Sequence, residues 1–219
     1  MSGWTALLWK DVRREARGKE ALQAGLVLLG LFLVLDLFAF PTLQGSPRAA
    51  AAALWTPLLY GGAALTGRGF AAEADRGTLD LLRSAPVPLL WHGLSRAAVH
   101  ALLTAGLALL GLGGVWLLFG IAAPLPVVAV LLLAAVGVAV AGTATSALAA
   151  QARGREVLLP ILLVPVLAPL LQAGLRATIA ALDGAALADL QVPLLLMAGY
   201  DLVAAGAAMV VLPLALEGD

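Results

Sequence analysis

The sequence predicts an all-α, polytopic membrane protein with six transmembrane helices and both termini in the cytoplasm. Three observations predict this class. First, 62% of the 219 residues are hydrophobic and 12% are charged, whereas a soluble domain is roughly 45–50% apolar and about 25% charged. Second, the apolar residues form runs long enough to cross a hydrocarbon core of ~30 Å. Third, the runs lack the alternation of a membrane β-barrel, so only helices can satisfy their backbone in lipid.

Charge and cysteine content exclude several kinds of site. Thirteen basic and thirteen acidic residues give a formal net charge of zero, so the chain lacks the basic excess of a nucleic-acid-binding protein. It contains no cysteine, which excludes disulfides and thiolate metal ligands. No glycine-rich phosphate loop with its lysine is present. We therefore expect a chain that is not an enzyme and that binds no cofactor of its own.

Residues 1–20 precede the first apolar run and are predicted to form an amphipathic helix in the membrane interface. Trp4, Leu7, Leu8 and Val12 fall on one helical face, and most of the charged residues lie elsewhere. Such a separation of faces is typical of interfacial helices. A cytoplasmic tail without fixed structure is the alternative interpretation.

Six apolar runs are long enough to span the membrane. The break at residues 120–126 divides a long uncharged stretch into two helices, because proline interrupts a helix interior but is tolerated at a helix start. On the outer side, the connection at 176–192 is long enough for a short interfacial helix. The single membrane domain, 1–219, then has spans at 21–40, 49–68, 95–120, 125–151, 157–175 and 193–216.

The distribution of lysine and arginine predicts the orientation of these spans. Five basic residues precede the first span, four belong to the connection between spans two and three, and two lie between spans four and five. Only Arg48 and Arg176 lie on the opposite side. Both termini are therefore expected in the cytoplasm. The bias also favours six spans, because removing one helix would mix the two sides.

Two carboxylates lie within predicted spans, and both are expected toward the outer leaflet. Asp36 is near the outer end of the first span, and Asp201 is about one third of the way into the sixth. An intramembrane carboxylate is costly, so each should face the bundle or a wet cavity. A role in a substrate path or in gating is one interpretation. A snorkelling or hydrogen-bonded packing group is the other.

The fifth span carries three prolines, and the chain has two histidines. Pro160, Pro165 and Pro169 each remove a helix hydrogen bond and favour a kink. They are candidate gating residues, although a static kink fits the pattern equally well. His92 and His100 are interpreted as packing residues, because a lone histidine without a ligand partner rarely forms a haem or metal site. No metal site is predicted.

Residues 69–93 form the connection between spans two and three, and part of it is predicted to be a short helix. Thr78 is a suitable N-cap, Asp80 lies in the first turn, and Pro86 ends the helix. Its leucines form an apolar stripe that the membrane, the bundle or a partner protein must cover. A solvated connecting loop is the alternative interpretation.

The stretch EADRGTLDLLRSAPVP resembles the first cytoplasmic loop of ABC-2-type transporter permeases. In that group, an acidic stretch, Gly-Thr/Ser-Leu-acidic and a downstream Pro-hydrophobic-Pro/Ser form the element that docks on the ATPase subunit. Nearly the whole chain is similar to the CcmB family, also called haem exporter protein B. The similarity rests on LLWKDVRREAR, PLLYGGAALTGRGFAAEADRGTLDLLRSAPVPLLW and LPILLVPVLAPLLQAG.

The resemblance implies a permease subunit in the bacterial inner membrane that acts in cytochrome c maturation. It would couple ATP hydrolysis by a separate CcmA-type ATPase to haem export or to haem-chaperone release, with ATP on the partner and haem as a substrate. Other implied partners are CcmC- and CcmD-type membrane subunits, the periplasmic chaperone CcmE and a second permease chain per ATPase dimer. The implied ATPase-coupling residues are Glu73, Asp75, Gly77, Thr78, Leu79, Asp80, Leu82 and Pro86.

Two alternatives from other classes stay open. One is an ABC-2 permease that exports a lipid, a polysaccharide or a drug, which fits the loop motif equally well. The other is a membrane scaffold without transport activity, or a small secondary transporter. A secondary transporter should show inverted repeats and midplane ion-binding groups, and neither is convincing in this sequence.

Overall fold

The computed structural model describes residues 3–39, 45–67, 70, 73, 77–78, 84, 87–150, 152 and 155–217. Every regular element within these ranges is helical, which confirms the predicted all-α class. The α-helices are α1 (Gly3–Gly18), α2 (Glu20–Ala39), α3 (Pro47–Gly67), α6 (Leu89–Phe119), α7 (Leu125–Ala149), α8 (Arg155–Leu182) and α9 (Gln191–Glu217). A short 3₁₀ helix, η2 (Leu187–Leu190), precedes α9.

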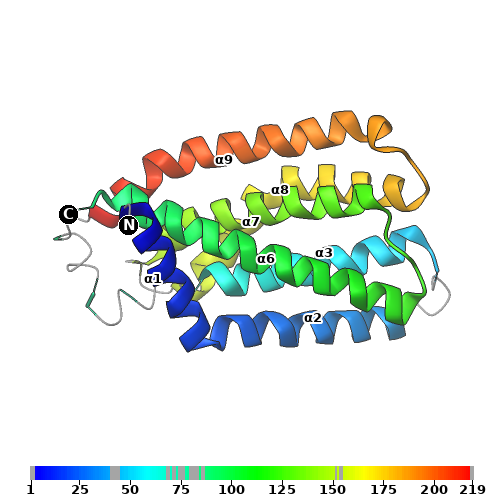
Figure 1. Cartoon of the computed structure of the whole chain (residues 1–219), viewed down its shortest axis with the longest axis horizontal. Coiled ribbons are helices and arrows are strands. Elements are labelled where there is room, and N and C mark those ends of the chain that lie inside the picture. Colours follow the sequence, from blue (N-terminus) through cyan, green and yellow to red (C-terminus); the bar gives the residue numbers. More distant parts are fainter. Residues whose placement is uncertain are drawn as a thin grey trace.

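Six of the helices, all except α1, are long and apolar enough to cross a membrane. They lie side by side and alternate in direction along the chain, so α1 and the end of α9 lie at the same end of the bundle (Figure 1). We call this end the α1 end. The predicted count of six long apolar helices is confirmed.

Helix α7 occupies the centre of the bundle and contacts α3, α6, α8 and α9. Its buried side is built from small residues, including Ala134, Gly137, Ala141 and Gly142, which let neighbouring helices approach closely. By contrast, α2 and α9 expose many large apolar side chains, among them Val27 and Leu202. In a membrane these outward faces suit contact with lipid chains.

Helix α8 is longer than predicted: it continues past residue 175 to Leu182, and the rest of the 176–192 stretch holds the short 3₁₀ helix η2. The chain stays helical to Leu182 because no helix-breaking residue follows position 175 until residues 183–184. There Gly184 adopts φ +97°, which glycine tolerates best and which ends the helix. The indole Nε1 of Trp55 also donates to Thr178 Oγ1 (3.0 Å), which fixes this extension against α3.

Helix α6 begins at Leu89, earlier than the predicted start near residue 95. Pro88 directly precedes it, and the next residues contain no breaker. Arg96 therefore lies inside a long helix and not in a connection. The core of the predicted coupling helix, residues 79–83, lies outside the described residues.

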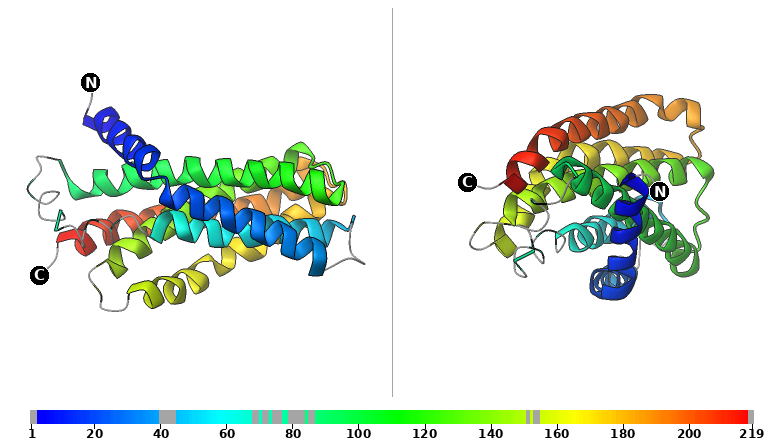
Figure 2. Two further views of the ribbon diagram at one scale, coloured as in Figure 1. Left: turned by 90° about the horizontal axis from the view of Figure 1, so that it is seen from below. Right: turned by 60° about the vertical axis from the view of Figure 1, so that its left-hand side comes forward.

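Helix α1 lies at an angle across the end of the bundle and packs on α6 (Figure 2). Lys19, which separates α1 from α2, has φ +52° and so changes the direction of the chain. A helix, α1 (Gly3–Gly18), lies within the predicted range 1–20, but its apolar residues are divided between two faces. Leu7 is buried, whereas Val12 is exposed together with Trp9.

Candidate coupling site

The carboxylate of Glu73 is the centre of the candidate site. Arg96 on α6 donates from Nη2 to Oε1 (2.6 Å) and from Nη1 to Oε2 (3.2 Å), which is a bidentate arrangement. Arg14 on α1 donates from Nη1 to the same Oε1 (2.6 Å). One carboxylate from the connection after α3 thus links α1 and α6.

A second carboxylate extends the network between α1 and α6. Asp11 accepts a hydrogen bond at Oδ2 from the hydroxyl of Ser95 (2.6 Å). Lys10 Nζ lies 3.1 Å from Asp11 Oδ1, and Arg96 Nη2 lies 4.0 Å from the same atom. Two acidic groups therefore surround the guanidinium of Arg96, which compensates its burial.

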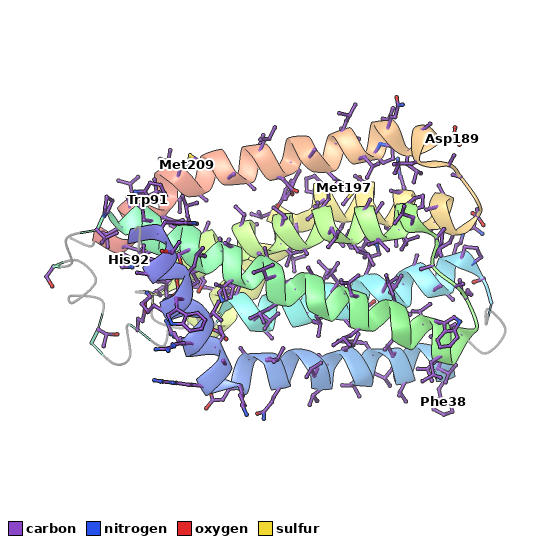
Figure 3. All side chains as sticks on the ribbon, in the orientation of Figure 1. Phe38, Trp91, His92, Asp189, Met197 and Met209 are labelled. Atoms are coloured by element: carbon purple, nitrogen blue, oxygen red, sulfur yellow. The ribbon has the colours of Figure 1, made fainter. Side chains whose placement is uncertain are left out.

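Aromatic rings border the network on two sides. The Cζ atom of Arg96 lies 4.2 Å from the centroid of the buried Phe70 ring, a cation–π arrangement. Trp4 of α1 meets Trp91 of α6 edge to face, with centroids 5.3 Å apart. Figure 3 labels Trp91 and His92 at the α1 end of α6. The contact between α1 and α6 therefore combines ionic and aromatic pairs.

Burial makes these ion pairs stronger than surface pairs. The side chains of Arg96, Asp11 and Glu73 are 5%, 3% and 12% exposed. Burial alone would raise the pKa of Glu73, but the positive charges of Arg96 and Arg14 outweigh it and lower that pKa. Burial lowers the pKa of Arg14 and raises the pKa of its neighbour Glu15. Glu73 is consequently an anion at neutral pH.

Three of the eight predicted coupling residues are described, and they form one turn. The backbone N–H of Thr78 donates to the carbonyl oxygen of Glu73 (3.0 Å), and so does its hydroxyl (3.2 Å). Gly77 adopts φ +63° within this turn and is exposed. The turn fixes Thr78 to the residue that carries the ion pairs. Asp75, Leu79, Asp80, Leu82 and Pro86 lie outside the described residues.

The predicted pathway carboxylates lie away from the coupling site. Asp201 packs against α7 at Gly137, where a larger residue would collide with its Oδ1, and beside Leu170 of α8. Its Oδ1 is buried and has no hydrogen-bond partner in the described part of the chain. Asp36 is partly exposed on α2, and its Oδ2 is likewise unpartnered among the described atoms.

The three prolines lie within one unbroken helix, since α8 runs through all of them. The side chains of Pro165 and Pro169 are exposed. The described part of the chain holds no cluster of His, Cys, Asp or Glu that could bind a metal ion.

Sequence reasoning missed the rest of the network around Glu73. Arg14, Arg96, Asp11 and Ser95 were not predicted as site residues, because their partners are distant in sequence. One signal for Arg96 was available. It is the one charged residue between Arg83 and Arg153, and charged residues in membrane helices are usually paired.

Comparison with known proteins gives one result that covers almost the whole chain. A family model described as CcmB protein matches residues 3–218. No curated protein matches the chain.

Proposed function

This chain belongs to the CcmB family, and we propose that it is the permease subunit of an ABC transporter whose separate, CcmA-type ATPase binds at the α1 end. Family membership gives it a role in the haem export system of cytochrome c maturation. The six long apolar helices make it a multi-pass membrane protein. We propose that the chain associates with an ATPase, where that ATPase binds, and which end of the bundle faces the cytoplasm.

The observation that carries the proposal is the bridge made by Glu73. A force applied to the connection after α3 reaches both α1 and α6 through the guanidiniums of Arg14 and Arg96. Both pairs are short, and in the buried Arg96 pair the loss of one charge would leave the other uncompensated. Transmission between two sites requires an element with two arrangements. We assign that element to the connection together with α1 and α6.

The residues around Glu73 divide into inner and outer parts in this proposal. Glu73 is the inner anchor, and the turn at Gly77 and Thr78 joins it to the outer part. The outer part, residues 79–86 together with Asp75, contacts the ATPase. Leu79 and Leu82 fill an apolar groove on the ATPase, and Asp75 and Asp80 pair with basic residues of the ATPase. Pro86 ends the proposed coupling helix.

The orientation follows from charge. Eleven of the thirteen basic residues belong to the α1 end or to the connections that reach it, and Arg48 and Arg176 do not. We propose that the α1 end faces the cytoplasm of a bacterium and that the protein lies in its inner membrane. Two permease chains would serve one ATPase dimer. CcmC- and CcmD-type subunits and the periplasmic chaperone CcmE complete the proposed set of partners.

Asp36, Asp201 and the prolines of α8 are proposed as secondary elements of the transport path. The position of Asp201 supports this, because its carboxyl group lies at the meeting of α7, α8 and α9. A change in its surroundings would alter the packing of three helices at once. Replacement by asparagine would keep the size and remove the charge.

Co-purification with the ATPase tests the proposal. Leu82→Glu and Asp80→Lys should abolish or strongly weaken association, because both alter the outer part. Glu73→Gln should keep association but uncouple ATP hydrolysis from haem transfer to the chaperone. Arg48→Glu, a charge change at the far end, is the matched control and should change neither. Normal association of both outer variants would refute the docking assignment.

A further inference from the structure

A row of polar side chains runs along the inner side of α6. His92, Arg96, His100 and Thr104 follow one another at intervals of four residues, so they lie along one slowly turning side of the helix. All four are more than nine-tenths buried, with exposed fractions of 6%, 4%, 1% and 0%. We call them the α6 polar row. At 1.5 Å per residue the row extends about 18 Å from the α1 end into the bundle.

Two side chains of the row, His92 and Thr104, have no hydrogen-bond partner among the described residues, and His100 has a partner for one of its two ring nitrogens. Arg96 is bound to Glu73, and His100 Nδ1 lies 3.2 Å from Thr143 Oγ1 on α7. Both ring nitrogens of His92, Nε2 of His100 and Oγ1 of Thr104 are buried with no hydrogen-bond partner among the described residues. Each such group costs about 1–3 kcal/mol if it stays dry. Their alignment on one helix side is unlike scattered packing defects.

The surfaces that face the row include small and hydroxyl-bearing residues of α3 and α7. The methyl group of Thr104 lies beside Gly62 of α3, and His100 meets Thr143 of α7. The adjoining contact between α3 and α7 is similar, because Thr66 packs on Gly142. Small and hydroxyl-bearing residues bury little apolar area, so parting them loses little hydrophobic stabilisation. Hydroxyl groups also remain satisfied when water enters.

We propose that the α6 polar row lines a water-filled cavity that opens toward the α1 end in a second conformation and takes the polar groups of an amphipathic cargo. This inference rests on the proposed function, because movement of the Glu73 connection pulls Arg96 and with it α6. In the opened arrangement water and cargo satisfy His92, His100 and Thr104. Polar side chains inside membrane proteins typically mark such paths. Without an opening, the unpartnered atoms of His92, His100 and Thr104 would remain buried at the cost given above.

Cysteine accessibility tests the cavity. The chain has no native cysteine, so Thr104→Cys and Thr143→Cys each report on one position. The probe is MTSES, an anionic methanethiosulfonate that does not enter lipid, applied from the α1 side to the complex with its ATPase in membrane vesicles. Leu102→Cys is the matched control, because Leu102 lies two residues away on α6 and is 69% exposed on the outer side of the bundle.

The expected result is modification of Thr104→Cys and Thr143→Cys at least about tenfold faster than Leu102→Cys in one nucleotide state, because the thiolate that reacts forms only in water. Two substitutions on different helices protect the test against one misfolded variant. If the complex forms and hydrolyses ATP but neither cysteine reacts faster than Leu102→Cys in any nucleotide state, the cavity is refuted and the proposed function stands. Fast labelling of a chain that binds no ATPase would support the cavity and refute the proposed function.

Discussion

The Glu73 bridge makes a quantitative prediction about stability. Glu73→Gln keeps the size of the side chain and removes the charge that balances Arg96, whose side chain is 5% exposed. Breaking a buried ion pair by removing one partner typically costs about 3–5 kcal/mol. Part of this cost is offset, because the glutamine oxygen can still accept a hydrogen bond from Arg96. In addition, Asp11 Oδ1 lies 4.0 Å from Arg96 Nη2 and keeps one negative charge beside the guanidinium. We therefore expect a loss of about 2–3 kcal/mol in the free energy of unfolding at pH 7.

The loss of stability caused by Glu73→Gln should decrease as the pH falls. The pKa of Glu73 is lowered in the folded protein from a usual value of 4.5. A carboxyl group of this kind stabilises the fold above its unfolded pKa and loses that contribution as the pH falls through the folded pKa. The difference between the wild type and Glu73→Gln should thus be full at pH 7 and shrink below pH 4.5.

The neighbouring Glu15 supplies a control, because its pKa is shifted in the opposite direction to that of Glu73. Burial raises the pKa of Glu15 in the folded protein, so its charge opposes folding once the pH exceeds that folded pKa. Glu15→Gln should leave stability at pH 7 unchanged or raise it. The two variants make the same chemical change, and only their surroundings differ.

The assay is equilibrium unfolding in detergent, followed by the fluorescence of the five tryptophans. A double-mutant cycle of Glu73→Gln with Arg96→Gln should give a coupling energy of at least about 1.5 kcal/mol. The bridge would be refuted if Glu73→Gln stays within about 0.5 kcal/mol of the wild type at pH 7, which is the range of ordinary surface substitutions. A loss that is equal at pH 7 and pH 4 would refute the electrostatic explanation.

Two further predictions concern helix packing. Thr178→Val removes the acceptor of the buried Trp55 indole N–H and should destabilise the protein by about 1–2 kcal/mol, seen as a lower thermal midpoint. Gly137→Ala places a methyl group against Asp201 and should cost about 1–3 kcal/mol. Gly106→Ala points into open space and should be neutral or stabilise by up to about 1 kcal/mol. Equal effects of the two glycine substitutions would contradict the described α7–α9 packing.

The helices were predictable because hydropathy acts locally. A run of apolar residues longer than a bilayer core must be helical in lipid whatever surrounds it, and all six runs are helices. Helix ends were less predictable. The sequence of α8 stays apolar and helix-compatible past residue 175, and only Gly184 with its positive φ ends that segment. The start of α6 was predicted near residue 95, but the helix begins directly after Pro88.

The candidate site was predictable only in part, for a physical reason. The resemblance identified Glu73, but the burial of Arg96 depends on an acid 23 positions away and on another in α1. A hydropathy scale gives the cost of burying a charged residue from that residue alone, and it contains no information about an ion-pair partner. The α6 polar row was visible as four polar residues at helical spacing, but which of them are buried depends on α3 and α7. Residues 79–83 stay a prediction from resemblance.

The Glu73 bridge also constrains the order of assembly during synthesis. Helix α1 leaves the ribosome before α6, yet the Ser95 hydroxyl and the Arg96 cation that contact Asp11 arrive only with α6. Before residue 96 is made and inserted, Asp11 lacks both the Ser95 hydroxyl and the cation of Arg96, and water is its best environment. Helix α1 therefore packs against the bundle only after α6 has been inserted. Nascent chains arrested before that point would present α1 to cellular quality control as an unattached segment.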